Sequence, residues 1–350
     1  MELAAIVHQY YAAFKAKYAT RLSAAQHAAL QAILRCRTPQ AGELLLLGCS
    51  ACAEHAHQPR SCGHRSCPKC QNHEASQWLE RQYAKLLPVE CFMVTFTLPD
   101  ELRELAWENP ATLYQALFAC ASSTLADFGL NPRHLGAHLG LTAVLHTHSR
   151  RLDYHPHVHF IVPGGGIDEA RRQWKKKAGK YLFNELALAK VFRARLLAAL
   201  NAAGLAIPHP LPTRWVVHCT HVGKGKPALQ YLSRYLYRGV LSERHIVANE
   251  EGHVSFQYTE ARSGATQYRR LRGEDFLWLL LQHVLPKGFR RVRDYGFLHG
   301  NAKKRLQLVQ LLLHVTGIAP QSRARPAFHC PRCHSPMHIL AIIRPAWASG

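Results

Sequence analysis

The stretch YHPHVHFIVPGGG, residues 154–166, decides the fold and indicates where the chemistry lies. Its apolar run predicts a β-strand, and successive side chains of a strand point to opposite faces of the sheet. His157 and His159 therefore share one face, while Val158 and Phe160 share the other. Two imidazoles about 7 Å apart on a rigid strand are a natural start for a metal site. A pair of half-buried histidines is the plainer interpretation, because the chain holds 24 histidines.

The neighbouring sequence supplies candidates for a third ligand. Residues 139–149 predict another strand, and the polar turn at 150–154 predicts that the two strands pair as an antiparallel hairpin. In that pairing His146 lies near the level of the two histidines and can face the same side. His148, two residues further along the strand, faces the same side as His146 and is the alternative third ligand. The glycines at 164–166 predict a flexible loop after the strand.

Charge limits the class of partner. The chain has 350 residues, with 44 Lys and Arg against 22 Asp and Glu, a net charge of +22. Such an excess predicts a polyanionic partner, and nucleic acid is favoured over membrane because no apolar run approaches the roughly 18 residues of a spanning helix. No secretory signal is visible at the N-terminus, so the eleven cysteines are expected in a reducing compartment, where clustered cysteines indicate metal ligands before disulfides.

Two CxxC pairs with fourteen residues between them lie in the N-terminal part of the chain. Two such knuckles complete a tetrahedral site of four thiolates, so this spacing predicts structural zinc bound by Cys49, Cys52, Cys67 and Cys70. Cys62 either replaces one of these ligands or joins a second site. The C-terminal tail holds half of a further zinc site, Cys330 and Cys333, which His329, His334 or His338 would complete.

Basic residues predict contact with single-stranded nucleic acid in two places, although a solvated charged loop explains each of them too. The first is RRQWKKKAGK, residues 171–180, where cations would contact phosphates and the indole would stack on bases. Its candidate residues are Arg171, Arg172, Trp174, Lys175, Lys176 and Lys177. The second is Lys224 and Lys226, just before a helix predicted at 228–240.

That helix carries Tyr231 and Tyr235, which at this spacing stand one above the other. A tyrosine pair on a helix more often serves packing. Its hydroxyl, with a pKa near 10, can nevertheless attack a phosphodiester when a divalent ion offsets charge in the transition state. The products are a 5′-phosphotyrosine and a free 3′-hydroxyl, and the conserved bond energy makes the step reversible.

Together these features resemble the HUH endonuclease superfamily, and within it the two-tyrosine rolling-circle transposases of the insertion-sequence-91 family. The resembling segments are SCGHRSCPKCQ (61–71), TFTLP (95–99), AVLHTHSRRLDYHPHVHFIVPGGG (143–166), YLSRYLYR (231–238) and HVLPKGFRRVRDYGFL (283–298). The resemblance implies Mg²⁺ or Mn²⁺ on His157 and His159, with His146 rather than His148 as third ligand. It also implies Tyr231 and Tyr235 as nucleophiles and zinc on the N-terminal cysteines. His148 and Ser149 depart from the residues that many relatives have.

The expected fold is α+β, with a central antiparallel sheet and helices packed against it. We expect an N-terminal helical segment (1–43), a zinc-binding domain (44–88), a catalytic domain (89–318) and a C-terminal tail (319–350) with a linker at 319–327. The expected activity is that of a DNA transposase that nicks and joins single strands at the ends of its element. Rival interpretations are a plasmid relaxase or replication initiator, and a non-catalytic zinc-finger DNA-binding protein.

The resemblance also implies partners and a location. The partner is single-stranded DNA at transposon ends and target, in a cytoplasmic, nucleoid-associated setting in a bacterium. No Walker motif is present, so strand separation is expected to come from a host helicase or from replication.

Overall fold

A computed structural model of the chain describes all residues except 1, 71, 237–240, 261–262, 316–326 and 345–350. Only the backbone is described for residues 72–74 and 234–236. None of the described helices has the length and apolar character needed to cross a membrane.

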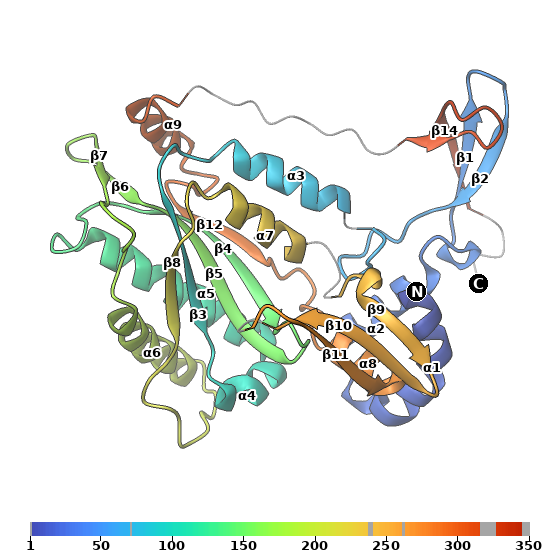
Figure 1. The fold of residues 1–350 in the computed structure, drawn as a ribbon, viewed down its shortest axis with the longest axis horizontal. Coiled ribbons are helices and arrows are strands. Elements are labelled where there is room, and N and C mark those ends of the chain that lie inside the picture. The colour runs from blue at the N-terminus through green and yellow to red at the C-terminus, as the bar shows by residue number, and fades with distance from the viewer. Residues whose placement is uncertain (1, 71, 237–240, 261–262, 316–326, 345–350) are drawn as a thin grey trace.

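The centre of the molecule is a five-stranded sheet of order β12-β4-β5-β3-β8, in which every neighbouring pair is antiparallel (Figure 1). Its strands are β3 (Cys91–Thr97), β4 (Gly140–His148), β5 (Tyr154–Pro163), β8 (Val217–His221) and β12 (Val292–Gly296). The predicted hairpin is confirmed, since β4 and β5 pair across the short turn. The α+β fold class is confirmed with it.

One face of this sheet forms the largest apolar core. Val158 and Phe160 of β5 point into it, as do Phe92, Val94 and Phe96 of β3, because alternate residues of each strand face the same way. Figure 1 shows α5 (Pro110–Leu130) and α6 (Glu185–Ala202) covering this side. The short helix α4 (Arg103–Glu108) precedes α5, and the break between them falls at Asn109-Pro110.

The other face carries the histidines and is covered by α3 (Asn72–Tyr83) and α7 (Lys226–Leu236), which pack against each other. Trp78 of α3 and Leu229 and Leu232 of α7 are buried against Val144 and Ile161 of the sheet. The sheet is therefore apolar where these helices pack and polar where the histidines lie.

A second core joins the two N-terminal helices to a segment far along the chain. Helices α1 (Leu3–Tyr18) and α2 (Ala24–Arg35) pack with α8 (Gly273–Leu281), and the ring of Tyr18 stacks on Trp278 at 4.7 Å. A separate three-stranded sheet completes this unit, with β9 (Ile246–Glu250), β10 (His253–Thr259) and β11 (Thr266–Arg272). The predicted N-terminal helices are confirmed.

Strands near the C-terminus pair with the segment that follows α2, in a four-stranded sheet of order β13-β14-β1-β2 (Figure 1). Its strands are β1 (Leu44–Cys49), β2 (His55–Pro59), β13 (Phe328–His329) and β14 (Pro336–Ile343). None of these strands was predicted. The residues expected to form a tail thus add two strands to the segment that follows α2, while the predicted linker lies almost wholly outside the described residues. The four-part domain division stays a prediction.

The glycines after β5 do not form the flexible loop that their composition predicts. Gly165 begins β6 (Gly165–Asp168), which pairs with β7 (Gln173–Lys176), and α9 (Lys303–Leu312) packs beside this hairpin. The Trp174 ring lies 2.5 Å from where a Cβ of Gly165 would stand. These glycines are therefore required by close packing rather than by mobility. Short 3-10 turns complete the fold at Ala19–Arg21, Pro39–Ala41, Asp100–Leu102 and Glu243–His245.

Gly296 at the end of β12 offers a test of this packing. Its φ is +60°, and an added Cβ would lie 1.7 Å from the carbonyl oxygen of Leu139. We expect Gly296→Ala to destabilise the protein by about 3 kcal/mol or more, through backbone strain and this clash. Gly288→Ala is the matched control, since its φ is +76° with no atom within 4 Å, and it should cost only about 1 kcal/mol. Thermal unfolding that ranks the two variants equally would contradict this account.

Candidate active site and metal centres

Three imidazoles converge on the face of the central sheet that α7 covers. The strand register places His146 of β4 directly opposite His157 of β5, and Val144 opposite His159. Ring centroids lie 5.2 Å apart for His146 and His157, 4.5 Å for His146 and His159, and 4.8 Å for His157 and His159. One ligand atom from each lies within 4.8 Å of the others. This histidine triad is a donor set suited to a divalent transition ion.

His148, the alternative third ligand, lies elsewhere. The pairing of β4 and β5 shifts after His146, so that His148 stands opposite Tyr154 rather than His155. The extra residue on β5 falls at His155-Pro156, and proline is tolerated at such a bulge because it has no N–H to donate. The ring of His148 lies 5.2 Å from that of His283 and 6.1 Å from that of His146.

Burial keeps the triad in the neutral form that a metal requires. Desolvation, and then the neighbouring imidazoles, lower the pKa of His146 and of His159 well below the usual range. Desolvation also lowers the pKa of His157 to about 4, against the opposing effect of its backbone hydrogen bond. At neutral pH all three rings therefore offer a lone pair.

Hydrogen bonds orient two of these rings. His157 donates from Nδ1 to the carbonyl oxygen of His155 at 2.7 Å, which leaves the lone pair on Nε2. His159 places Nδ1 2.8 Å from Oγ1 of Thr95, which stands opposite it on β3. Such contacts fix the tautomer of a metal-binding histidine and raise its basicity.

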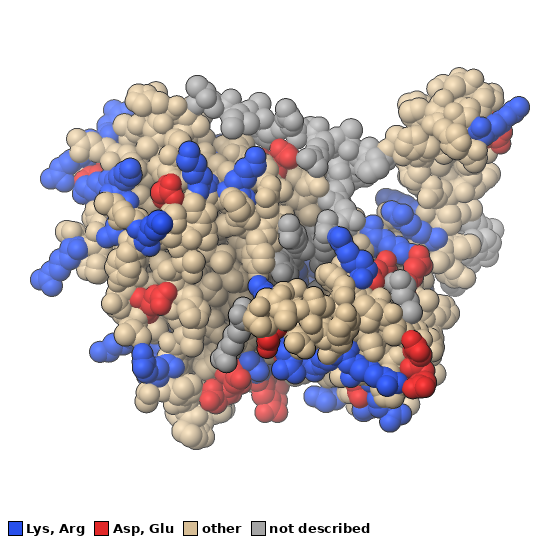
Figure 2. Space-filling model, in the orientation of Figure 1, with Lys and Arg blue, Asp and Glu red and all other residues tan. Residues whose placement is uncertain are grey.

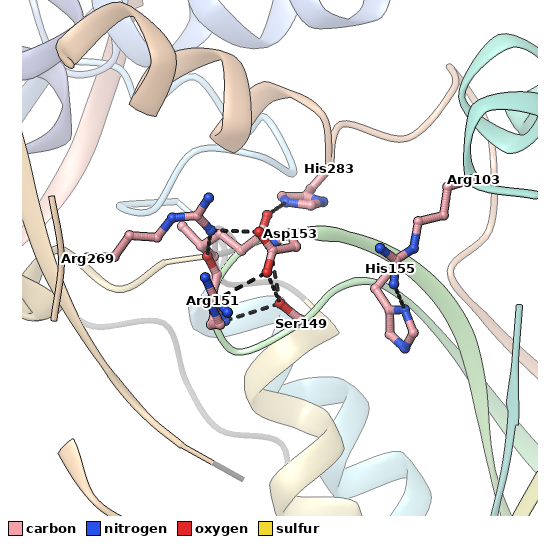
Figure 3. Close-up of polar contacts among 8 residues, drawn as sticks. Arg103, Ser149, Arg151, Asp153, His155, Arg269 and His283 are labelled. Atoms are coloured by element: carbon pink, nitrogen blue, oxygen red, sulfur yellow. Dashed lines mark hydrogen bonds and ion pairs between the residues drawn. The ribbon is translucent and has the colours of Figure 1, made fainter. Parts of the chain in front are cut away.

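The turn that joins β4 and β5 is held from the second core (Figure 3). Arg269 of β11 donates to the Asp153 carboxylate at 2.7 Å and to the carbonyl oxygen of Arg151 at 2.6 Å. Leu152, with a φ of +67°, is buried in that core, and His283 donates from Nε2 to its carbonyl oxygen at 2.9 Å. The unit formed by α1, α2, α8 and the small sheet thus fixes the hairpin that carries the triad.

Helix α7 brings a tyrosine to the triad. The ring of Tyr231 lies 6.5 Å from that of His159, with the two planes nearly perpendicular at 88°. Tyr235 follows one turn later on the same helix, and its side chain lies outside the described part of the structure. A tyrosine ring beside a cluster of metal-ligand side chains is an arrangement that suits nucleophilic attack.

The predicted DNA contacts in residues 171–177 lie on the β6–β7 hairpin, where Figure 2 shows lysine and arginine side chains gathered. Arg171, Arg172 and Lys176 are exposed, and Lys177 is half-buried. Lys175 is held by Asp168 at 2.9 Å. Trp174 is half-buried, with its ring 5.9 Å from that of Phe297, so its contacts are those of a packing residue rather than of a base-stacking one.

Lys226 is the first residue of α7, the helix that carries the tyrosines, and Lys224 lies in the turn before it; both are exposed. The ammonium of Lys226 stands 5.4 Å from the centre of the Tyr83 ring.

A basic cavity that the sequence did not predict lies beside the triad's face. It has a volume of about 860 Å³ and is formed by α3, β12, α9 and the loops around them. Six cationic residues line it: Arg65, Arg81, Lys85, Arg290, Arg291 and Lys303. Asp294 also lines the cavity, and its carboxylate forms an ion pair with Lys85, with Oδ2 2.6 Å from Nζ. Trp78 and Val292 line the cavity and also pack in the cluster that includes Tyr231.

The cysteines form two four-thiol clusters. One joins Cys36, Cys62, Cys67 and Cys70, and the other joins Cys49, Cys52, Cys330 and Cys333. The prediction that the two N-terminal knuckles share one ion is therefore wrong. The first knuckle ends strand β1 and faces β14, whereas the second lies near the end of α2. Cys36 was missed, because a lone cysteine has no spacing signal.

The triad's composition can be tested by metal titration. We expect His146→Ala to lower Mn²⁺ affinity on the order of 100-fold, because it removes one of three ligands. His148→Ala should leave the affinity within a few fold, since its ring packs against His283. Isothermal titration calorimetry on both full-length variants checks this, with far-UV circular dichroism to verify folding. If His148→Ala lost Mn²⁺ affinity and His146→Ala kept it, the third ligand would be His148, and our assignment of His146 would be wrong.

The hydrogen bond between His159 and Thr95 has a separate consequence. Thr95→Val keeps the shape of the side chain and removes the acceptor for His159, so we expect roughly tenfold weaker Mn²⁺ binding. Thr97→Val, on the same strand, is the control, because among the described residues Thr97 makes no side-chain hydrogen bond to the triad. Equal Mn²⁺ affinities for the two variants would show that Thr95 does not contribute to metal binding.

Comparison with known proteins agrees with this architecture. Residues 140–305 match a family model described as "Putative transposase", which covers β4, β5 and α7. Residues 6–98 match one described as "Transposase zinc-binding domain". A solved structure, "Conjugative Relaxase TrwC in complex with mutant OriT Dna", is 15% identical over 62% of this chain and 72% of that one, with a TM-score of 0.28. A TM-score this low does not establish a shared fold.

Two curated relatives carry the comparison further. "Putative transposase y4qJ" of Sinorhizobium fredii (strain NBRC 101917 / NGR234) is 34% identical over 95% of this chain and 93% of its own length. "Transposase for insertion sequence element IS801" of Pseudomonas savastanoi pv. phaseolicola is 30% identical over 72% of this chain and 64% of its own length. The chain belongs to the insertion-sequence-91 family of transposases.

Proposed function

We propose that this transposase nicks and joins single DNA strands through Tyr231 and Tyr235, with a divalent metal ion held by His146, His157 and His159. The observation that carries the proposal is the position of Tyr231, whose ring stands 6.5 Å from that of His159 at the edge of the triad. A nucleophile so close to three neutral imidazoles suits attack on a phosphate between them.

The triad supplies the donors for the ion. Three buried, neutral imidazoles would fill only part of the coordination shell of Mg²⁺ or Mn²⁺ and would leave positions for phosphate oxygens, although such nitrogen donors take Zn²⁺ or Ni²⁺ more tightly. When bound, the ion polarises the phosphoryl oxygens and offsets the charge of the transition state.

The tyrosine makes the covalent bond. Its Oη bonds to phosphorus as the bond from phosphorus to the 3′ oxygen breaks, and the phenolic proton is lost as the 3′ oxygen gains one. The products are a 5′-phosphotyrosine and a free 3′-hydroxyl. The reverse attack by another 3′-hydroxyl joins strands without added energy. Tyr235, one turn along α7, gives a second acceptor for the paired transfers that transposition requires.

The basic cavity supports a path for the DNA backbone. Its cations would neutralise phosphates. Trp78 and Val292 line the cavity and also belong to the apolar cluster that includes Tyr231, which supports a path beside the proposed nucleophile. The exposed cations of the β6–β7 hairpin and of the start of α7 extend it. The cysteine clusters are suited to structural zinc, and strand separation would fall to a host helicase or to replication.

Two rivals share part of this arrangement. A plasmid relaxase or replication initiator would use the same chemistry, but the family to which the chain belongs favours transposition. A non-catalytic DNA-binding protein would need no metal at the triad and no hydroxyl at position 231. The buried, oriented histidines argue against that rival, because burying three imidazoles without a ligand has a desolvation cost.

A covalent adduct tests the nuclease directly. Full-length protein is incubated with labelled single-stranded DNA from the element's ends and Mn²⁺, then separated under denaturing conditions. We expect an adduct with the wild type, none after addition of EDTA, and none with the Tyr231→Phe, Tyr235→Phe double variant. Tyr268→Phe, an exposed tyrosine on β11, is the control and should match the wild type. If the double variant formed as much adduct as the wild type, the proposal would be contradicted.

A further inference from the structure

We propose that Cys49, Cys52, Cys330 and Cys333 bind a second zinc ion, which ties the C-terminal segment of the chain to residues 44–59. This site is independent of the nuclease chemistry. The zinc-binding family model matches residues 6–98 and the transposase model matches 140–305, so Cys330 and Cys333 lie outside both. The site is built from two segments that meet only in the folded chain.

The sulfur positions fit one tetrahedral ion. Sγ of Cys49 lies 3.5 Å from Sγ of Cys333, and Sγ of Cys52 lies 3.6 Å from Sγ of Cys330. All four sulfurs lie within 4.8 Å of one another. Zinc–sulfur bonds of about 2.3 Å in a tetrahedron require sulfurs about 3.8 Å apart. A disulfide would instead need about 2.05 Å, and all four cysteines are free thiols.

The two knuckles have the same backbone conformation, which is independent support for a shared ion. In the first, Cys49 donates from N to the oxygen of Glu54 at 2.9 Å, and Ala53 donates to the oxygen of Cys49 at 3.0 Å. In the second, Cys330 donates to Ser335 and His334 donates to Cys330, both at 2.9 Å.

The two knuckles also share a strained backbone conformation at one position. The residue after the second cysteine has a positive φ in both, +57° at Ala53 and +59° at His334. A positive φ has a free-energy cost for a residue that is not glycine, and both knuckles adopt it at the equivalent position. The knuckles face each other across the pairing of β1 and β14. None of the tail histidines belongs to the cluster, so the second knuckle is completed by cysteines rather than by His329, His334 or His338.

The small sheet around these cysteines has little else to hold it. Its buried residues are Leu45, Leu47, Cys49, Cys330 and Met337, so two of its five core side chains are proposed ligands. Segments this short rarely bury enough apolar surface to fold unaided and commonly depend on a metal. Removing the ion should therefore release the C-terminal strands from β1.

Cobalt substitution tests the site in the full-length protein. Co²⁺ bound by thiolates has sulfur-to-metal charge-transfer bands that the histidine triad cannot give. We expect the Cys330→Ser, Cys333→Ser variant to lose about half of the wild-type band intensity, and Cys36→Ser, Cys62→Ser to lose the other half. The matched control is Cys120→Ser, Cys219→Ser, which replaces two free thiols outside both clusters and should keep full intensity.

Two further variants guard against simple misfolding. Cys49→Ser, in the other segment of the site, should cause the same loss as the Cys330→Ser, Cys333→Ser variant. Cys333→His, at an exposed ligand position, should still bind one ion at this site, with weaker and shifted bands. Full band intensity in the Cys330→Ser, Cys333→Ser variant would overturn the proposal. So would wild-type protein in which these four cysteines are recovered as disulfides by alkylation and mass spectrometry. Neither result would bear on DNA cleavage.

Discussion

The register between β4 and β5 is the constraint on which the site depends. Because His146 stands opposite His157, and Val144 opposite His159, the three imidazoles share one face and one level of the sheet. A slip by one residue would move either strand's histidines to the opposite, apolar face, where Phe160 and Val158 now pack. The aromatic core on that face resists such a slip, so packing on one side of the sheet fixes the arrangement of the imidazoles on the other.

Three parts of the chain hold this hairpin. The pairing with β3 brings Thr95 to His159, and the α7 helix brings Tyr231. Arg269 of β11 and His283, which follows α8, hold the turn. Each support comes from a different region of the sequence. Hydrogen bonds orient the rings of His157 and His159 in the folded protein, which would lower the ordering cost of binding an ion.

Much of the centre was predictable because its signals are local. Alternation in residues 154–163 predicts a strand, a short polar turn predicts its pairing, and tyrosines four apart on a helix share a face. Spacing left His146 and His148 open, since a bulge at His155-Pro156 cannot be read from alternation. The grouping of the cysteines failed for another reason: a CxxC pair specifies two ligands and is silent about which distant pair completes the site. The basic cavity was missed because its cations come from four separate segments.

The two cysteine clusters differ in how far apart their members lie along the chain. Cys36 and Cys70 are separated by 34 positions, whereas Cys52 and Cys330 are separated by 278. At a synthesis rate of roughly 5 to 20 residues per second, the distant thiols leave the ribosome roughly 15 to 60 s after their partners. The local cluster can thus assemble early during translation, while the other waits for the rest of the chain to emerge. A chain cut short before Cys330 would leave Cys49 and Cys52 without the two thiols that complete their cluster.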